Sequence, residues 1–283
     1  GVLARSDFGR VEIDAMIGRV NHFRRDLLDS DTRGDPVNLY GLISRVEVGR
    51  EFEVGAYAIV SHDTTGPTGQ QRNLGLRAHG SLGNWAPWAE LGIVNGHRGG
   101  RRLKGQAVDI GTVYTREDWP LQPRLIAGYA FGSGDDDPDD GTDRNFRQTR
   151  YHANEARLGG LYRRGIYGEV LDPELSNLHI VSAGIGLSPT PRWSIDLLWY
   201  GFRQDRIGDL RHARLDPRQD NRSGRALGNE LNLVVAYAPS RAVIVGAVVG
   251  LFEPSARFER NEAGRHRDPG RAVYGGIEMK MRF

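Results

Sequence analysis

The chain has 283 residues, of which 38 are glycine and none is cysteine, and its formal net charge is +2. The lack of cysteine excludes a disulfide framework, and the near balance of acidic and basic residues argues against a nucleic-acid partner. Only 39% of the residues are apolar, which is low for the core of a soluble domain of this length. No stretch approaches the run of about eighteen apolar residues that a transmembrane helix requires.

The dominant sequence pattern is an alternation with a period of two. In residues 9–23, Val11 and Ile13 fall on one face of an extended chain, whereas Glu12 and Asp14 fall on the other. The same alternation predicts strands at 38–48, 52–62, 73–82, 85–97, 102–116, 121–133, 177–188, 192–204, 229–238, 241–252 and 271–283. These make about twelve strands, and several are long enough to cross a bilayer at a tilt.

Tight turns alternate with longer polar connections along the chain. We expect the tight turns at 49–50, 83–84, 118–120, 189–191 and 239–240, and the long extracellular loops near 134–176, 205–228 and 254–270. This arrangement is typical of outer-membrane barrels, which have short turns in the periplasm and long loops outside the cell. The sequence therefore predicts an all-β protein, with residues 1–283 forming one transmembrane antiparallel β-barrel in the bacterial outer membrane.

A soluble antiparallel barrel or sandwich is the alternative, because its strands also alternate with a period of two. In that case the apolar face would surround a core instead of facing lipid. Three features favour the membrane barrel, namely the length of the strands, the charge on the second face and the aromatic residues near strand ends. These aromatic residues are Trp88, Trp119, Tyr129, Trp193, Trp199, Tyr237 and Phe283.

From residue 126 onward the sequence resembles the alginate export porin family. The motifs that carry the resemblance are AGYAFGSG (127–134), NFRQT (145–149), NEARLGGLYRRGIYGEVLDPELSNL (154–178), DLLWYGFRQ (196–204), LGNELNLVV (227–235) and GLFEPSARF (250–258). The resemblance implies an outer-membrane barrel of eighteen strands that passes an anionic exopolysaccharide through an Arg-rich constriction. This chain would supply about twelve of those strands. The others would precede residue 1, or the chain would be a smaller relative.

The resemblance also implies where arginines would face the pore, and the chain departs from the family in two places. Arg157, with Arg163 or Arg164, lies in the stretch where the family places arginines that fold toward the pore. Residues 241–252 read RAVIVGAVVGLF, where the alginate exporter has pore-facing arginines. The short connection at 239–240 leaves no room for the periplasmic gate loop of the best-studied member.

The alternation itself predicts a polar inner face. Inward side chains would include Arg45, Arg77, Arg124, Lys280 and Arg282 together with Asp196, Glu230 and Glu278, and the loop residues Arg147, Arg157, Arg163 and Arg164 could fold into the mouth. Guanidinium groups bind carboxylates bidentately. Acidic residues among them would weaken this binding enough for an anionic chain to be released and to pass. The alternative is that these charges only pair across strands and keep the lumen wet.

Two further features concern metal binding and assembly. The run GDDDPDDGTD brings together hard oxygen ligands for calcium, namely Asp135, Asp136, Asp137, Asp139 and Asp140, although it also reads as a solvated loop. No other cofactor is expected. The terminal Phe283 resembles the signal by which the barrel-assembly machinery recognises its clients.

The sequence therefore predicts a channel for export or passage of an anionic, alginate-like polysaccharide. Expected partners are outer-membrane lipid, the polysaccharide, the assembly machinery and periplasmic export proteins. A general diffusion porin for small anionic solutes is the alternative. An outer-membrane lipid hydrolase using His79 and Ser81 is a further alternative, but no G-x-S-x-G motif accompanies these residues, and an enzyme is not expected.

Overall fold

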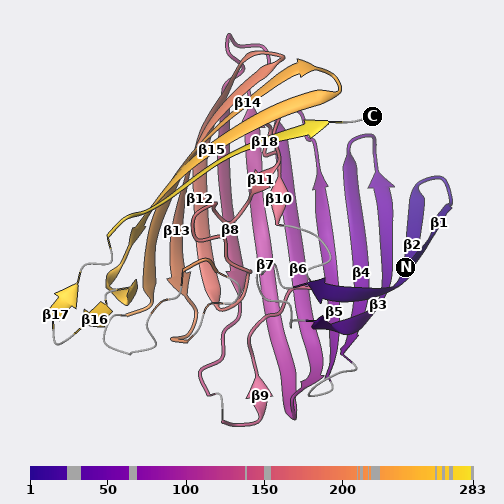
Figure 1. Ribbon diagram of the computed structural model, residues 1–283. Coiled ribbons are helices and arrows are strands. Elements are labelled where there is room, and N and C mark those ends of the chain that lie inside the picture. The colour runs from indigo at the N-terminus through magenta and orange to yellow at the C-terminus, as the bar shows by residue number, and fades with distance from the viewer. Residues whose placement is uncertain are drawn as a thin grey trace.

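A computed structural model of the chain describes residues 1–23, 33–63, 69–137, 139–149, 154–208, 210, 213–215, 217, 224–258, 260–262, 265–267 and 270–281. Within these residues the fold is dominated by one 14-stranded sheet. The sheet curves strongly, so that one face is convex and the other encloses a hollow (Figure 1). In the described residues, no helix is long and apolar enough to cross a membrane.

The long strands of the sheet follow one another in chain order, and each pairs antiparallel with the next. They are β1 (Val2–Asp7), β2 (Val11–Phe23), β3 (Arg33–Val48), β4 (Phe52–Asp63), β5 (Gly69–Gly80), β6 (Trp85–Arg98), β7 (Arg101–Thr115), β8 (Arg124–Gly132), β12 (Leu178–Thr190), β13 (Trp193–Gln204), β14 (Ala226–Ser240), β15 (Val243–Pro254) and β18 (Ala272–Met281).

The remaining elements are short and lie in the connections. They are β9 (Thr142–Asp143), which pairs parallel with β7, the pair β10 (Glu155–Ala156) and β11 (Arg164–Gly165), the pair β16 (Arg260–Glu262) and β17 (Arg265–Arg267), and the 3-10 helix η2 (Ala256–Phe258). All of them lie in connections after β7, so the C-terminal half of the sheet has the more elaborate loops (Figure 1).

Two predicted tight turns lie two residues further along than expected. The predicted turns at 189–191 and 239–240 fall at 191–192 and 241–242, because the strands continue through a register shift to Thr190 and Ser240. The hydroxyl groups of these two residues accept hydrogen bonds from the backbone N–H groups two positions on, at 3.2 Å in each case. A side chain that caps the turn in this way fixes the turn at the residues that follow the proline.

The sequence pattern did not predict β1, and this strand changes the edge of the sheet. The pairing of 271–283 with 9–23, which would close a twelve-stranded barrel, is not formed. β2 lies between β1 and β3, and in the described residues β18 pairs only with β15. The sheet is thus an incomplete barrel with β1 and β18 as its edges (Figure 1).

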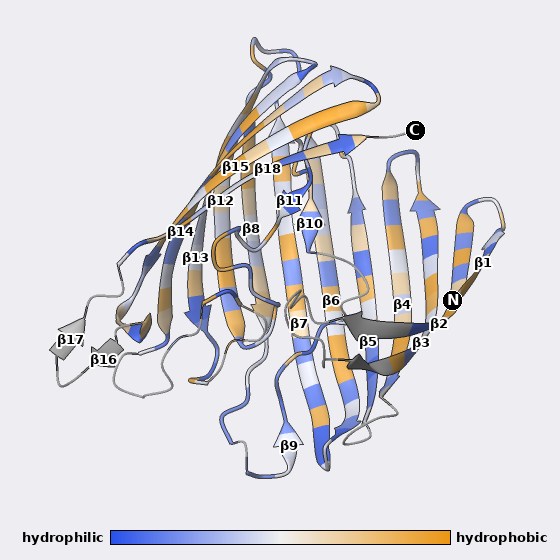
Figure 2. Cartoon of the chain, in the orientation of Figure 1, coloured by the Kyte–Doolittle hydropathy of each residue, from blue (hydrophilic) through white to orange (hydrophobic). Residues whose placement is uncertain are grey.

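The two faces of the sheet differ in the way that the alternation predicts. On β13, Asp196, Leu198 and Tyr200 are buried on the hollow side, whereas Leu197 and Trp199 alternate with them and are exposed on the convex side. Figure 2 shows the resulting alternation of polar and apolar residues along the strands. A soluble sandwich would bury the apolar face, so the exposed leucine, isoleucine and valine side chains of the convex face identify it as the surface toward lipid.

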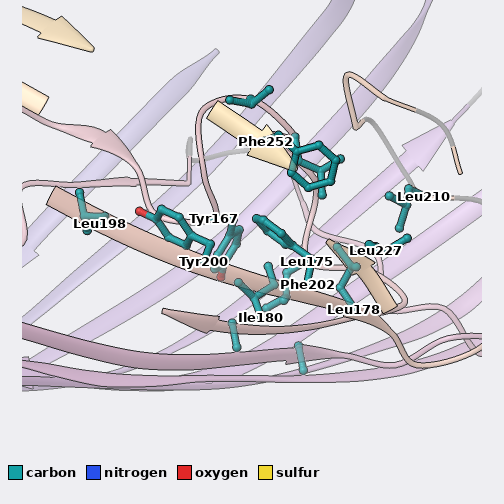
Figure 3. Packing of buried hydrophobic residues seen from close by; sticks show 14 of the residues in the cluster. Tyr167, Leu175, Leu178, Ile180, Leu198, Tyr200, Phe202, Leu210, Leu227 and Phe252 are labelled. Atoms are coloured by element: carbon teal, nitrogen blue, oxygen red, sulfur yellow. The ribbon is translucent and has the colours of Figure 1, made fainter. Parts of the chain in front are cut away.

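The apolar core lies on the hollow side, between the sheet and the connection from β8 to β12. Tyr167 and Leu175 of this connection belong to one buried cluster with Leu198, Tyr200 and Phe252 of the strands. Figure 3 shows side chains of this cluster gathered between the connection and the strands. The described residues 145–149 and 154–177 therefore fold back over the hollow side of the sheet, and we call them the inner loop.

Candidate functional site in the hollow of the sheet

The hollow side divides into two parts. The open wall is the hollow-side face of β1–β6, where polar side chains are partly exposed. The covered wall is the hollow-side face of β7, β8 and β12–β15, over which the inner loop lies.

Ion pairs between neighbouring strands dominate the first part of the open wall. Arg5 Nε lies 2.8 Å from Asp14 Oδ1 and 3.0 Å from Glu12 Oε1. Arg45 of β3 pairs with the same two carboxylates from the other side. The register sets these contacts, because Arg5 stands opposite Asp14 and Glu12 stands opposite Arg45.

The row of polar residues continues across β4, β5 and β6. Arg77 stands opposite Glu90 in the register, and its guanidinium lies 3.8 Å from Glu53. The hydroxyl of Tyr57 donates a hydrogen bond of 2.9 Å to Glu90. The open wall is thus a belt of mixed charge, with each cation beside at least one acid.

On the covered wall, a single carboxylate anchors the inner loop. Glu230 is 1% exposed and accepts hydrogen bonds from three consecutive backbone N–H groups of the loop, those of Glu169 (2.5 Å), Val170 (2.9 Å) and Leu171 (3.0 Å). The side-chain amide of Asn232 donates a fourth hydrogen bond, of 2.9 Å. This buried carboxylate is fully satisfied, which is the condition for placing a charge out of water.

A second buried carboxylate joins the loop to the wall through two arginines. Asp196 Oδ1 lies 2.7 Å from Nη2 of Arg124, and Asp196 Oδ2 lies 3.2 Å from Nη1 of Arg164. All three side chains are 1% exposed. Arg124 comes from β8 and Arg164 from the loop, so the three charges connect two strands and the loop.

The first part of the inner loop reaches back to β5. The backbone oxygen of Arg147 accepts hydrogen bonds from Gln71 (3.1 Å) and Asn73 (2.7 Å). Next to it, Phe146 packs over β7 at Gly105, where an added Cβ would lie 2.7 Å from the Phe146 backbone. A residue without a side chain is therefore required where the loop approaches the sheet this closely.

The loop also contacts the last strand. Tyr162 donates a hydrogen bond to Glu278 of β18, and the Lys280 ammonium lies 4.8 Å from the centre of the Tyr162 ring. Burial and the neighbouring carboxylate raise the pKa of the Tyr162 hydroxyl well above its usual value. Contacts with β5, β14 and β18 together show that the inner loop spans the hollow from one part of the sheet to another.

Two arginines near the middle of the inner loop keep exposed side chains. Arg157 is exposed, and Arg163 is exposed with its guanidinium 4.0 Å from Glu155. Arg147, by contrast, pairs with Asp143. Burial alone would raise the pKa of Asp143, but the hydrogen bond and charge of Arg147 outweigh it, and this pKa is lowered.

The predicted calcium ligands contact arginines in the structure. Asp135 lies 2.7 Å from Arg101, and Asp140 lies 2.6 Å from Arg144, which lowers the pKa of Asp140 through their hydrogen bond. In the described part of the chain, no three His, Asp or Glu side chains are grouped so that they could hold a metal ion. Calcium at Asp135, Asp136, Asp137, Asp139 and Asp140 stays a prediction.

The predicted pore-lining residues thus fall into three groups in the structure. The first group, Arg124, Arg164, Asp196 and Glu230, is buried between loop and wall. The second group faces the hollow with partial or full exposure, and consists of Arg45, Arg77, Arg147, Arg157, Arg163, Glu278 and Lys280. Arg282 and the predicted assembly signal Phe283 lie outside the described residues.

Sequence reasoning missed the residues that hold the loop through their backbone or through small size. Gly105 and Gly246 lie on the hollow face, where an added Cβ would meet the loop at 2.6 and 2.4 Å. The sequence signal for such a contact is a glycine at an inward-facing strand position, combined with apolar residues in the connection that folds over it.

A curved antiparallel sheet with an apolar convex face, a charged hollow and an inward-folded loop defines the protein as an outer-membrane β-barrel channel. The model of the family described as "Alginate export" matches residues 16–269, and the chain belongs to this family. The family and the fold are those of a transport channel.

A solved outer-membrane protein structure shows the same type of fold, and a second gives a weaker alignment. OccK11 (OpdR) from Pseudomonas aeruginosa aligns with a TM-score of 0.56 and 12% identity over 99% of this chain and 70% of that one. CdiB from Escherichia coli aligns with a TM-score of 0.39 and 12% identity over 96% of this chain and 50% of that one. No curated protein sequence gives a significant match.

Proposed function

We propose that the channel passes an anionic polysaccharide of the alginate type, and that Arg157 and Arg163 contact it in the hollow. The observation that carries this proposal is the inner loop. Buried charges anchor the loop to the wall at Arg164 and at residues 169–171, whereas Arg157 and Arg163 stay exposed. A loop held across the hollow narrows the path, so a passing polymer must come close to these side chains.

The chemistry of the exposed residues suits a polyuronate. A guanidinium group binds a carboxylate with two parallel hydrogen bonds, and a row of uronates offers such a carboxylate at each sugar. Two of these arginines have an acid nearby, with Glu155 beside Arg163 at 4.0 Å and Glu53 beside Arg77 at 3.8 Å. These acids compete for the arginines and favour release, which conduction requires.

Single-channel recording in planar bilayers tests the proposal. Polyuronate should block the ion current at lower concentration than a neutral glucan of equal length. The double variant Arg157→Ala/Arg163→Ala should raise the half-blocking concentration of polyuronate by about tenfold, because two charge-assisted contacts are lost. Arg241→Ala removes one exposed cation from the β14–β15 turn, at the end of the strands opposite the long connections, and should leave the block unchanged.

The alternative is a general diffusion porin for small anionic solutes. The mixed charge of the open wall, where Glu12 and Asp14 stand beside Arg45, favours this alternative because it provides a wet path without a purely basic track. Such a porin would conduct small anions and show no block by polyuronate beyond that of the neutral polymer. That result, or an unchanged block in the double variant, would reject the polysaccharide channel.

A further inference from the structure

The convex face of the sheet carries an apolar groove between β4 and β8. Its volume is about 560 Å³, and its convex-side lining includes Leu74, Leu76, Leu91, Ile93 and Val108. The lining leucine and isoleucine side chains are about half exposed, so the groove is open toward the surrounding lipid.

The strand register places a row of polar residues immediately beyond the groove, toward the ends of the strands where the long loops leave the sheet. Leu74, Ile93 and Gln106 form one row across β5, β6 and β7. The next convex-side row, about 7 Å further along the strands, is Arg72, Asn95 and Lys104. The row after that is Gln70, His97 and Arg102. Figure 2 shows the polar ends of β6 and β7 next to β9.

The cations of these rows are exposed and lack acidic partners. Arg72 donates to the neighbouring Gln70 at 2.7 Å, and Arg102 and Lys104 make no ion pair in the described part of the chain. No Asp or Glu occupies a convex-side position on β5, β6 or β7, strands that the structure describes in full.

Elsewhere on the same face and at the same end of the sheet, some charged side chains have partners of opposite charge. His179 lies 3.6 Å from Asp205, and Arg271 lies 3.3 Å from Glu253. Among the described residues, Arg72, Arg102 and Lys104 form a group of three unpaired cations on β5 and β7, whereas Arg203 is a single exposed cation opposite His179. Lipid-facing arginine and lysine are costly unless they reach the interface or meet an anion.

We infer that this surface binds a phosphorylated lipid of the outer leaflet, of the lipid A type, with its phosphates on Arg72 and Lys104 and an acyl chain in the groove. Arginine offers a fork of donors and lysine a compact charge, and both bind phosphate well. Arg72 and Lys104 are two strands apart, or about 10 Å, so a headgroup with two separate phosphates can engage both.

The position of the cations along the strands indicates which leaflet the bound lipid belongs to. In outer-membrane barrels the long loops face the outside, where the leaflet is built from phosphorylated glycolipid with several acyl chains. A lipid of the opposite leaflet, such as phosphatidylglycerol, would require the cations at the turn end of the same strands. Trp85 and Tyr114 occupy the convex side there, with their ring centres 4.7 Å apart.

Binding of lipid A to the whole protein in detergent, measured by native mass spectrometry, tests the inference. The variant Arg72→Ala/Lys104→Ala should bind lipid A about tenfold more weakly, because it loses both phosphate contacts. The matched control is Arg50→Ala/Arg241→Ala, which removes two exposed cations from the turn end and should bind like the unaltered protein. Single-channel conductance should be the same in all three proteins, since these residues do not face the hollow.

A second arm leaves the protein unaltered and changes the lipid. Lipid A without its phosphates but with the same acyl chains should bind the unaltered protein no more tightly than intact lipid A binds the Arg72→Ala/Lys104→Ala variant. Equal binding of intact and dephosphorylated lipid A would overturn the inference, as would equal loss in the control variant. Equal binding of phosphatidylglycerol would overturn the assignment to the glycolipid.

Discussion

The open wall and the covered wall arise from the same alternation of residues, but they satisfy their charges in different ways. On the open wall, Arg45 pairs with Glu12 and Asp14 on the adjacent strand, and its side chain is 19% exposed. On the covered wall, Asp196 and Glu230 are 1% exposed, and their partners include the inner loop. An inward charge can therefore keep a path wet or hold a loop in place, and its burial decides between these roles.

The largest expected effect comes from Glu230→Ala. The substitution leaves the backbone N–H groups of Glu169, Val170 and Leu171 buried without an acceptor. Each hydrogen bond to a charged group contributes about 1.5–3 kcal/mol, so docking of the loop should weaken by roughly 3 kcal/mol or more. We expect faster proteolysis within the inner loop and a larger single-channel conductance.

Glu53→Ala is the matched change on the open wall. Glu53 lies 3.8 Å from Arg77, and both side chains are about 30% exposed. Removal of a partly exposed pair should change the free energy of unfolding by less than about 1 kcal/mol and leave the loop protected. If the two variants released the loop equally, the distinction between the walls would be wrong.

Gly168→Ala should have a smaller but clear effect on the covered wall. Gly168 has φ +94°, and an added Cβ would lie 2.7 Å from Glu230 Oε1. Strain of this kind costs about 1–3 kcal/mol, which urea unfolding in detergent can measure. Gly275→Ala on β18 is the control, because nothing lies within 4 Å of its added Cβ. Similar losses in both variants would mean that the loop does not require this conformation.

The faces of the strands could be predicted from the sequence because alternation alone determines them. Leu76 faces outward and Arg77 faces the hollow, as their positions in an alternating segment indicate. β1 could not be predicted in this way, because Val2–Asp7 contains three polar residues in a run of six. Arg5 meets Asp14 only once the two strands are paired.

The inner loop could not be predicted from the sequence for a different reason. Alternation shows which residues face the hollow, but not which of them a loop will cover. Glu230 binds backbone N–H groups about sixty positions earlier in the chain, and any sequence at 169–171 would offer those groups. The resemblance to the alginate export family placed arginines in this loop, yet Arg164 is buried while Arg157 and Arg163 are exposed.

The smallest predicted effect is a dependence of loop docking on pH. Burial raises the pKa of Glu169 in the inner loop, so the docked loop favours the neutral carboxyl group. This contribution to docking is fully present below the ordinary value of about 4.3 and is lost as the pH rises through the raised pKa. Asp143 has a lowered pKa, and its contribution is lost only as the pH falls through that value.

Hydrogen exchange of the two segments should therefore separate them. After correction for intrinsic exchange rates, protection of residues 165–171 should decrease as the pH is raised above about 4.3, whereas protection of residues 143–147 should not. Glu169→Gln keeps an acceptor for the Gly165 N–H, which now lies 2.9 Å from the Glu169 carboxylate, and removes the titration. Protection of 165–171 should then be independent of pH. A pH dependence that persisted in Glu169→Gln would assign the effect to another group and would reject a neutral Glu169 as the cause.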